Sequence, residues 1–262
     1  MTMKEMANAV AEGINARGIK AEVAEVTKNG IINYGVTIGE GVVRPTFYVR
    51  EDGKVNNMIN EFVEQYNNLP ENNFGELIKD FTDFDKIKGK IIPVLNMRND
   101  ESLVTRQFLD MTLVYKIMLS DEASVTVKKE HLKSWNVTED DIYNVAIENA
   151  RGTFSLTTMG EMLGMSELDD ESNPMYVATN ENKLFAAAAM LYKDTFTELY
   201  NSYGKLAILP SSIHELLILK YDDNADELND MVRTVNMTQV DPKEWLSDHI
   251  YIFNGNEVVM DA

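Results

Sequence analysis

The spacing of apolar residues divides the first part of the chain into helices and strands. Apolar side chains recur at helical intervals over residues 3–17 and 55–66, so both segments are predicted to be amphipathic helices. Between these helices we expect three strands, and alternate residues are apolar over 32–38 and 43–49, as in half-buried strands. Pro45 has no amide hydrogen to donate to a neighbouring strand, so it predicts an edge position for the third strand.

The middle of the chain contains two apolar segments and one helix start. Residues 90–97 resemble a buried strand, and the strongly apolar residues 109–119 suit a strand or a helix, of which we favour the strand. Thr138 and Asp141 have the spacing of a capping box, in which the threonine oxygen accepts a hydrogen bond from a helix amide that has no intrahelical partner. A helix is therefore expected over 139–150.

The last third of the chain repeats one order of elements: strand, strand, helix, twice over, and then a hairpin. The predicted elements are strands 175–179 and 184–191, a helix over 196–203, strands 206–210 and 213–220, a helix over 224–237, and a hairpin of 249–253 and 256–260. The Ala186–Ala189 run favours a helix by propensity, but its place between two turns favours a strand. Asn254-Gly255 is a strong signal for a hairpin turn.

The order of elements predicts an α+β fold made of two α/β units with mainly antiparallel sheets, because short turns cannot make parallel crossovers. Residues 164–174 are polar and acidic, and we take them as the linker between the units. The expected domains are therefore residues 1–163 and 175–262.

Composition narrows the classes of function. The chain has 262 residues, of which 44% are hydrophobic and 26% charged, as in globular proteins. Its 43 acidic and 24 basic residues give a net charge of −19, which repels a phosphate backbone, so nucleic-acid binding is not expected. The simplest interpretation of this charge is that it keeps the protein soluble. The more specific interpretations are a basic protein partner or mimicry of nucleic acid.

Cysteine is absent, which excludes disulfides, thiolate metal sites and a cysteine nucleophile. Residues 1–17 contain no apolar run typical of a signal peptide, and no later segment resembles a membrane span, so we expect a cytoplasmic protein.

Several motifs for cofactors and metals begin in this sequence but are incomplete. His214-Glu215 begins a zinc-protease pattern, yet Ile218 stands where the second histidine is needed. Asp222 begins a calcium-loop pattern, yet Glu227 replaces the glycine that the turn requires. We therefore predict no cofactor and no metal.

Histidines, serines and carboxylates gather in two C-terminal segments, 210–215 and 247–249. If the final hairpin packs beside strand 213–220, these side chains converge and suit acid–base chemistry or nitrogen and oxygen ligation. Serine and aspartate also end strands and cap turns, and a histidine can satisfy a buried carbonyl, so a structural role is the alternative. The candidate residues are Ser211, Ser212, His214, Glu215, Asp248 and His249.

The same segments carry a family resemblance. The stretches are PTFYV at 45–49, FLDMTLVYKIML at 108–119, MYVATN at 175–180, LAILPSSIHELLIL at 206–219 and VNMTQVDPKEWLSDHIYIF at 235–253. Together they resemble a family of uncharacterised Firmicutes proteins that is described as a domain of unknown function. The resemblance implies no activity or cofactor, but its motifs coincide with the candidate residues.

Two functions from different classes remain. We favour a non-catalytic binding or adaptor protein, because no complete catalytic motif is present and because the acidic chain has 15 methionines, a residue that adapts to varied partners when exposed. The alternative is a hydrolase-type enzyme that uses His214 with neighbouring serine and aspartate. In the enzyme, His214 would lie within hydrogen-bond reach of Asp248 or His249; in the adaptor, backbone groups would satisfy these residues separately.

Overall fold

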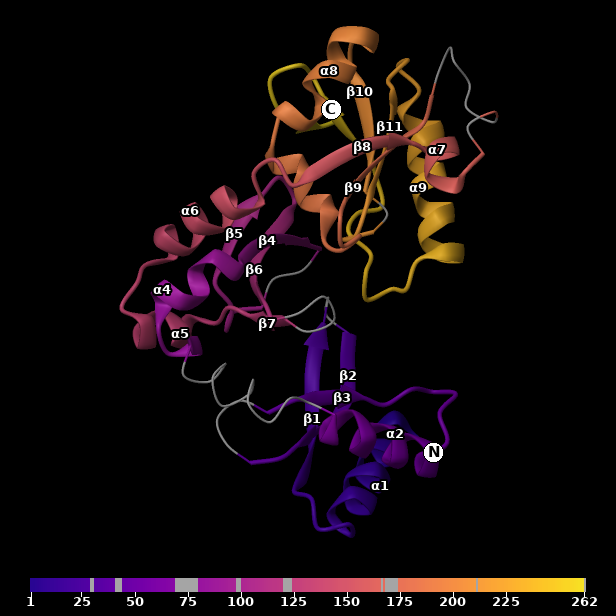
Figure 1. Cartoon of the computed structure of the whole chain (residues 1–262). Helices are drawn as coiled ribbons and strands as arrows, with labels where there is room; N and C mark the ends of the chain where they lie inside the picture. The colour runs from indigo at the N-terminus through magenta and orange to yellow at the C-terminus, as the bar shows by residue number, and fades with distance from the viewer. Residues whose placement is uncertain are drawn as a thin grey trace. The chain divides into compact units, whose positions relative to one another are not determined.

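A computed structural model describes most of the chain as two compact units, Met1–Lys86 and Ile87–Ala262 (Figure 1). The described residues are 1–28, 31–40, 44–68, 80–97, 100–119, 124–165, 167, 174–210 and 212–261. The chain has the predicted α+β fold, and every strand pairing among these residues is antiparallel.

The first unit is a three-stranded sheet with two helices. Its elements are α1 (Met3–Asn15), β1 (Ala21–Lys28), β2 (Ile31–Ile38), β3 (Thr46–Tyr48) and α2 (Val55–Asn67), and the strand order is β1-β2-β3. Both helices share one core with the sheet, where Ile14, Val36, Met58 and Phe62 are almost completely buried. The predicted edge position of the third strand is confirmed, although β3 begins after Pro45.

The second unit contains two sheets and begins with a four-stranded one. Its elements are β4 (Ile91–Asn96), β5 (Thr105–Phe108), β6 (Met111–Met118), β7 (Ser124–Thr126), α5 (Lys129–Trp135) and α6 (Glu139–Ala150), preceded by α4 (Phe84–Ile87) and η1 (Lys88–Lys90). β6 is central, with β4 on one edge and with β5 and β7 on the other. The buried strand predicted at 90–97, the strand favoured at 109–119 and the helix predicted at 139–150 are thus confirmed.

The helix α6 begins and packs as its sequence predicts. Thr138 Oγ1 accepts a hydrogen bond from the Asp141 amide at 3.2 Å, and Asp141 Oδ2 accepts one from the Thr138 amide at 2.8 Å. At its other end, Asn149 Nδ2 donates to the carbonyl oxygens of Lys88 (2.7 Å) and Ile91 (2.8 Å). These bonds fix α6 to the start of β4.

The second sheet has six strands in the order β13-β12-β10-β11-β9-β8. The strands are β8 (Phe154–Thr158), β9 (Tyr176–Asn180), β10 (Leu206–Leu209), β11 (Leu216–Lys220), β12 (Tyr251–Phe253) and β13 (Val258–Met260). The helical segments are α7 (Met159–Leu163), η3 (Ala186–Leu191), α8 (Asp194–Tyr203) and α9 (Ala225–Gln239). The final hairpin and its Asn254-Gly255 turn are confirmed.

Alternation along β12 sends neighbouring side chains to opposite faces of this sheet. Ile252 packs with Leu228 and Val232 of α9 on one face. On the other face Phe253 contacts Phe196 of α8, with ring centroids 5.5 Å apart. Tyr251, two residues before Phe253, belongs to that second face.

Three sequence predictions differ from the structure. The first is the domain boundary, which lies at Lys86/Ile87 and not at 164–174. β8 and β9 stand on either side of the predicted linker and pair with each other, from Phe154 with Asn180 to Thr158 with Tyr176. Most of 164–174 lies outside the described residues, but this pairing places the strands on both sides of it in one sheet.

The second difference is Ala186–Leu191, which is a 3₁₀ helix and not a strand. β9 already pairs with β8 on one edge and with β11 on the other, so the six-stranded sheet has no edge beside β9 for this segment. All four alanines are completely buried, and their small side chains allow this close packing.

The third difference is the strand predicted at 213–220. β11 begins only at Leu216, so His214 and Glu215 precede the strand and do not alternate along it. The final hairpin pairs through β12 with β10 and not with β11.

Candidate functional site

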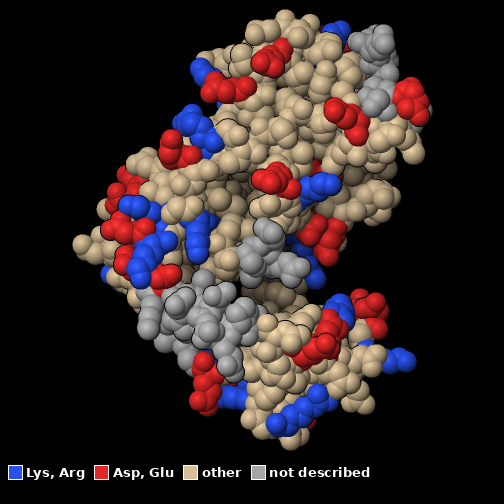
Figure 2. All heavy atoms as spheres, in the orientation of Figure 1, with Lys and Arg blue, Asp and Glu red and all other residues tan. Residues whose placement is uncertain are grey.

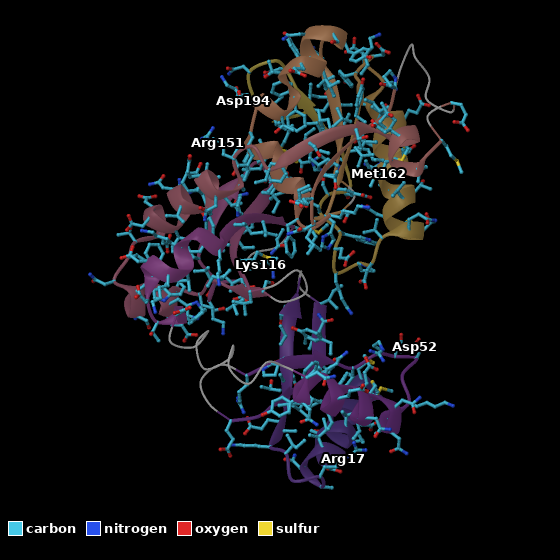
Figure 3. The ribbon with its side chains drawn as sticks, in the orientation of Figure 1. Arg17, Asp52, Lys116, Arg151, Met162 and Asp194 are labelled. Atoms are coloured by element: carbon cyan, nitrogen blue, oxygen red, sulfur yellow. The ribbon has the colours of Figure 1, made fainter. Side chains whose placement is uncertain are left out.

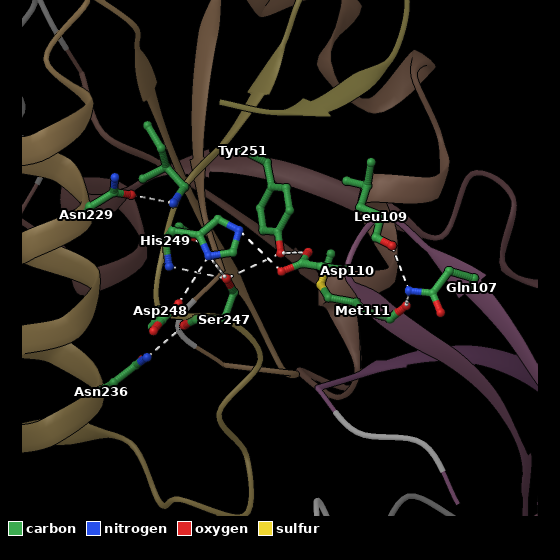
Figure 4. Close-up of polar contacts among 11 residues, drawn as sticks. Gln107, Leu109, Asp110, Met111, Asn229, Asn236, Ser247, Asp248, His249 and Tyr251 are labelled. Atoms are coloured by element: carbon green, nitrogen blue, oxygen red, sulfur yellow. Dashed lines mark hydrogen bonds and ion pairs between the residues drawn. The ribbon is translucent and has the colours of Figure 1, made fainter. Parts of the chain in front are cut away.

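Polar side chains from two sheets meet in the second unit, at the segment that enters β12 (Figure 4). We call this group the His249 cluster: Asp110, Ser247, Asp248, His249 and Tyr251. Four of its members come from the chain just before and within β12, and Asp110 comes from the turn between β5 and β6.

The turn that carries Asp110 has an unusual backbone. Phe108 and Met111 pair across it, which leaves Leu109 and Asp110 as a two-residue connection. Leu109 has a φ of 54°, in the left-handed region that residues with a Cβ rarely adopt. Gln107 Nε2 supports the turn by donating to the carbonyl oxygens of Leu109 (2.7 Å) and Met111 (3.1 Å), so the position of Asp110 is well defined.

The Asp110 carboxylate joins the four-stranded sheet to the segment around β12. The Tyr251 hydroxyl donates to Asp110 Oδ1 at 2.5 Å. His249 Nε2 lies 3.4 Å from Asp110 Oδ2, which is close enough for attraction to a protonated ring. This nitrogen is buried and makes no hydrogen bond to any residue that the structure describes, so the pair is a near contact without hydrogen-bond alignment.

The other ring nitrogen of His249 faces a serine and a second carboxylate. Nδ1 lies 3.2 Å from Ser247 Oγ and 3.1 Å from Asp248 Oδ1. The rings of His249 and Tyr251 are 5.0 Å apart. The imidazole is thus held between two carboxylates, of which Asp248 is largely exposed and Asp110 about 40% exposed.

Ser247 is buried, and its side chain contacts the backbone of His249 and the side chain of Tyr251. It is only 3% exposed, and its Oγ accepts a hydrogen bond from the His249 amide at 3.2 Å and lies 3.3 Å from the Tyr251 hydroxyl. Helix α9 holds the same segment, because Asn236 Nδ2 donates to the Ser247 carbonyl (2.7 Å) and Asn229 Oδ1 accepts from the Ile250 amide (2.8 Å).

Burial dominates the electrostatics of Tyr251. The side chain is completely buried, which raises the pKa of its hydroxyl, and the hydrogen bond to Asp110 raises the pKa further. The tyrosine therefore stays protonated at physiological pH and acts as a donor to the carboxylate. The contact is a charge-assisted hydrogen bond in which the donor is inside the protein and the acceptor reaches solvent.

The second group of predicted residues surrounds His214. Its Nδ1 accepts a hydrogen bond from the Phe185 amide at 3.3 Å, and the two rings stack with centroids 5.3 Å apart. His214 Nε2 lies 3.6 Å from Glu244 Oε1, and the His214 amide donates to Ser212 Oγ at 3.1 Å. Lys116, labelled in Figure 3, lies over the Phe185 ring at 5.3 Å.

Neighbouring backbones bring the two predicted segments together. The Ser247 amide donates to the Pro210 carbonyl (3.2 Å), and the Ile213 amide donates to the Glu244 carbonyl (2.9 Å). The side chains do not converge, since no hydrogen bond, ion pair or ring contact between described residues joins His214 to Asp248 or His249. Glu215 is exposed and takes no part in either group, and Ser211 lies outside the described residues.

Sequence reasoning missed Asp110 and Tyr251, which complete the His249 cluster. Asp110 is the one carboxylate in the mainly apolar segment 108–119, and a carboxylate at such a place is a signal that could have been used. Tyr251 gave no such signal, because a tyrosine in a strand is ordinary.

The His249 cluster has the residue types of a hydrolase triad, with His249 between Ser247 and Asp110. A nucleophilic serine must also be reachable by substrate, and Ser247 is buried. Within the described part of the chain, no three histidine or carboxylate side chains lie close enough together to hold a metal ion. No helix of that part is long and apolar enough to cross a membrane.

The architecture and these contacts define an α+β protein in which a carboxylate from a turn of one sheet contacts a histidine and a tyrosine at a strand of another sheet. The chain belongs to a family of unknown function (DUF5688), whose model matches residues 3–255. Comparison with curated proteins and with solved structures gives no match.

Proposed function

We propose that this protein is a non-catalytic binding or adaptor protein whose second unit engages a basic protein partner. The observation that carries the proposal is the concentration of negative charge near the C-terminal end of the sequence. Between residues 222 and 261, ten side chains are acidic and two, Arg233 and Lys243, are basic. An excess of negative charge of this kind attracts a basic partner and speeds its association.

The charge around α4, α5 and α6 is different. There the face shown in Figure 2 has acidic and basic side chains next to each other. Lys128 lies 3.7 Å from Glu130, Arg151 lies 3.3 Å from Glu148, and Arg106 pairs with Asp140. Interspersed charges of this kind support solubility, whereas the excess at 222–261 is suited to recognition.

The His249 cluster also supports a non-catalytic role. Its serine is buried, and its carboxylate and histidine hold two sheets together through contacts that a substrate would have to break. The Phe185 amide donates to His214 Nδ1, whereas the His249 amide donates to Ser247 Oγ, so the two histidines belong to separate groups of contacts.

A binding experiment with defined peptides tests the proposal. The probe is a fluorescent 18-residue peptide of leucine and lysine with helical periodicity, and the control is the same peptide with glutamate in place of lysine. We expect the basic peptide alone to bind the full chain, with an affinity that falls as salt is raised because charge attraction is screened. Equal binding of both peptides, or of neither, would reject a basic partner.

The hydrolase is a second candidate, and one observation favours it. His249 lies between Ser247 and Asp110, as in a hydrolase triad: Ser247 Oγ is 3.2 Å from His249 Nδ1, and His249 Nε2 is 3.4 Å from Asp110 Oδ2. A fluorophosphonate probe labels activated serines, so a mass increase on the peptide containing Ser247 would support this enzyme. Absence of labelling under conditions that label a known serine hydrolase would dismiss it.

Two properties follow from the proposed role. We propose a cytoplasmic location and no affinity for nucleic acid, since the net charge of −19 opposes contact with phosphates. A gel shift at physiological salt that shows micromolar or tighter binding to DNA or RNA would contradict the second property.

A further inference from the structure

Helix α9 buries one face and leaves a broad face open to solvent. Leu228, Val232 and Asn236 lie four residues apart and are almost completely buried. The helix covers one face of the six-stranded sheet, and Figure 1 shows it at the outside of the second unit. Side chains on the opposite side of α9 are therefore directed away from the protein.

The outer face of α9 consists of two stripes at helical spacing. One stripe contains Asp226, Asp230, Arg233 and Met237, and the other contains Glu227, Met231, Thr234 and Thr238, all of which are exposed. The acidic residues occupy the N-terminal half of the face, and the methionines extend it toward the C-terminal end. The outer face thus combines three carboxylates near one end with two methionines, and these two groups offer two kinds of attraction.

Helix stability explains only part of this face. Carboxylates in the first turn complement the helix dipole, which accounts for Asp226 and Glu227. Asp230 lies beyond that turn and is 3.1 Å from Arg233, the only basic side chain on the outer face. Met237 is 78% exposed and Met231 36% exposed, so each presents apolar surface to solvent.

Exposed methionine beside carboxylates points to one kind of partner. The unbranched thioether adapts to apolar side chains of different shapes, and the carboxylates attract lysine and arginine. A single amphipathic helix with a basic side offers both features together. The fifteen residues of α9 extend over roughly 22 Å, which is long enough to contact about four turns of such a helix.

We infer that the outer face of α9 is the docking surface for a basic amphipathic helix of the partner protein. This inference rests on the proposed binding function and adds to it the place and the chemistry of contact. The partner's lysine or arginine side chains lie against Asp226, Glu227 and Asp230, and its apolar side chains lie against Met231 and Met237.

Charge variants with a matched control test the place of binding. The test variant is Asp226→Asn/Glu227→Gln/Asp230→Asn, and the control is Glu139→Gln/Asp194→Asn/Glu198→Gln, which removes three exposed charges from α6 and α8. Both triples include first-turn positions, so both change helix-dipole interactions. We expect the α9 triple to bind the leucine–lysine peptide about tenfold more weakly than the control triple.

Two further arms test the apolar part of the surface. Met237→Gln is expected to weaken peptide binding several-fold, while Met165→Gln, at another exposed methionine, leaves it unchanged. A peptide of the same composition in scrambled order, which cannot separate its apolar and basic sides, is expected to bind at least tenfold more weakly. Circular dichroism melts confirm that each variant is folded before binding is compared.

The outcomes separate this inference from the proposed function. If the peptide binds the wild type but the two charge triples bind it equally, the binding function stands and the α9 surface is rejected. Equal binding of the ordered and scrambled peptides rejects an amphipathic helix as the ligand. If the wild type binds no basic peptide, the proposed function itself fails.

Discussion

The hydrogen bond from Tyr251 to Asp110 offers the most direct test of how the second unit is held together. Tyr251→Phe removes only the hydroxyl from a completely buried ring, so no cavity of side-chain size results. The lost bond is charge-assisted, and such bonds contribute roughly 1.5–3 kcal/mol. Because Asp110 is about 40% exposed and can regain water, we expect a loss near the lower end, about 1.5 kcal/mol.

Tryptophan fluorescence during urea unfolding measures this loss in the correct unit. Both tryptophans of the chain, Trp135 and Trp245, belong to Ile87–Ala262, so their signal reports that unit alone. The control is Tyr200→Phe, which removes a hydroxyl that contributes no hydrogen bond among the described residues; it should change the free energy of unfolding by less than about 0.5 kcal/mol.

A double-mutant cycle then isolates the contact itself. Tyr251→Phe, Asp110→Ala and the double variant should show a coupling free energy of about 1 kcal/mol, because each single change already removes the same bond. A coupling near zero, with both single variants destabilised, would mean that the two residues stabilise the unit separately. That result would refute the view that Asp110 joins the two sheets through Tyr251.

Four further predictions concern stability. Burial raises the pKa of Tyr115, Tyr192 and Tyr251, so the unfolded chain loses these protons near pH 10 while the folded chain keeps them. Urea unfolding at a series of pH values should show stability falling above about pH 10, by up to about 1.4 kcal/mol per pH unit for each tyrosine, whereas these tyrosines add no pH dependence well below it. Gly255→Ala should cost about 1–3 kcal/mol, because Gly255 has a φ of 95° and an added Cβ would lie 2.4 Å from the Tyr200 ring, whereas Gly89→Ala, with open space around it, should have little effect. Thr138→Ala should lower the free energy of unfolding by about 1 kcal/mol through loss of the α6 cap, and an unchanged urea midpoint would contradict that role. His214→Ala should lower stability by roughly 1–3 kcal/mol, because it leaves the Phe185 amide unpaired, and should leave peptide binding intact; the opposite pattern would assign His214 to the binding surface.

Local pattern determined most of the elements from sequence alone. The helices α1, α2, α6 and α9 and the final hairpin lie where apolar spacing, capping residues and Asn-Gly predicted them. The periodicity of apolar residues in a helix or strand reflects which side of that element faces the core. A chain with this share of hydrophobic residues was expected to form a core, so the periodicity could be used. The same reasoning could not place the domain boundary, since polar residues occur both between units and between strands of one sheet.

The candidate site was determined only in part by sequence. Serine and histidine at 210–215 and 247–249 do lie on neighbouring segments of backbone, yet the side chains form two groups. The hairpin pairs with β10, so His249 faces Asp110 and not His214. Asp110 and Tyr251 are 141 positions apart, and they meet only because the order of strands and the faces of two sheets bring them together. Sequence periodicity predicts which residues of a helix or strand are buried. It does not predict which residues they contact, because those contacts depend on how elements that are distant along the chain pack together.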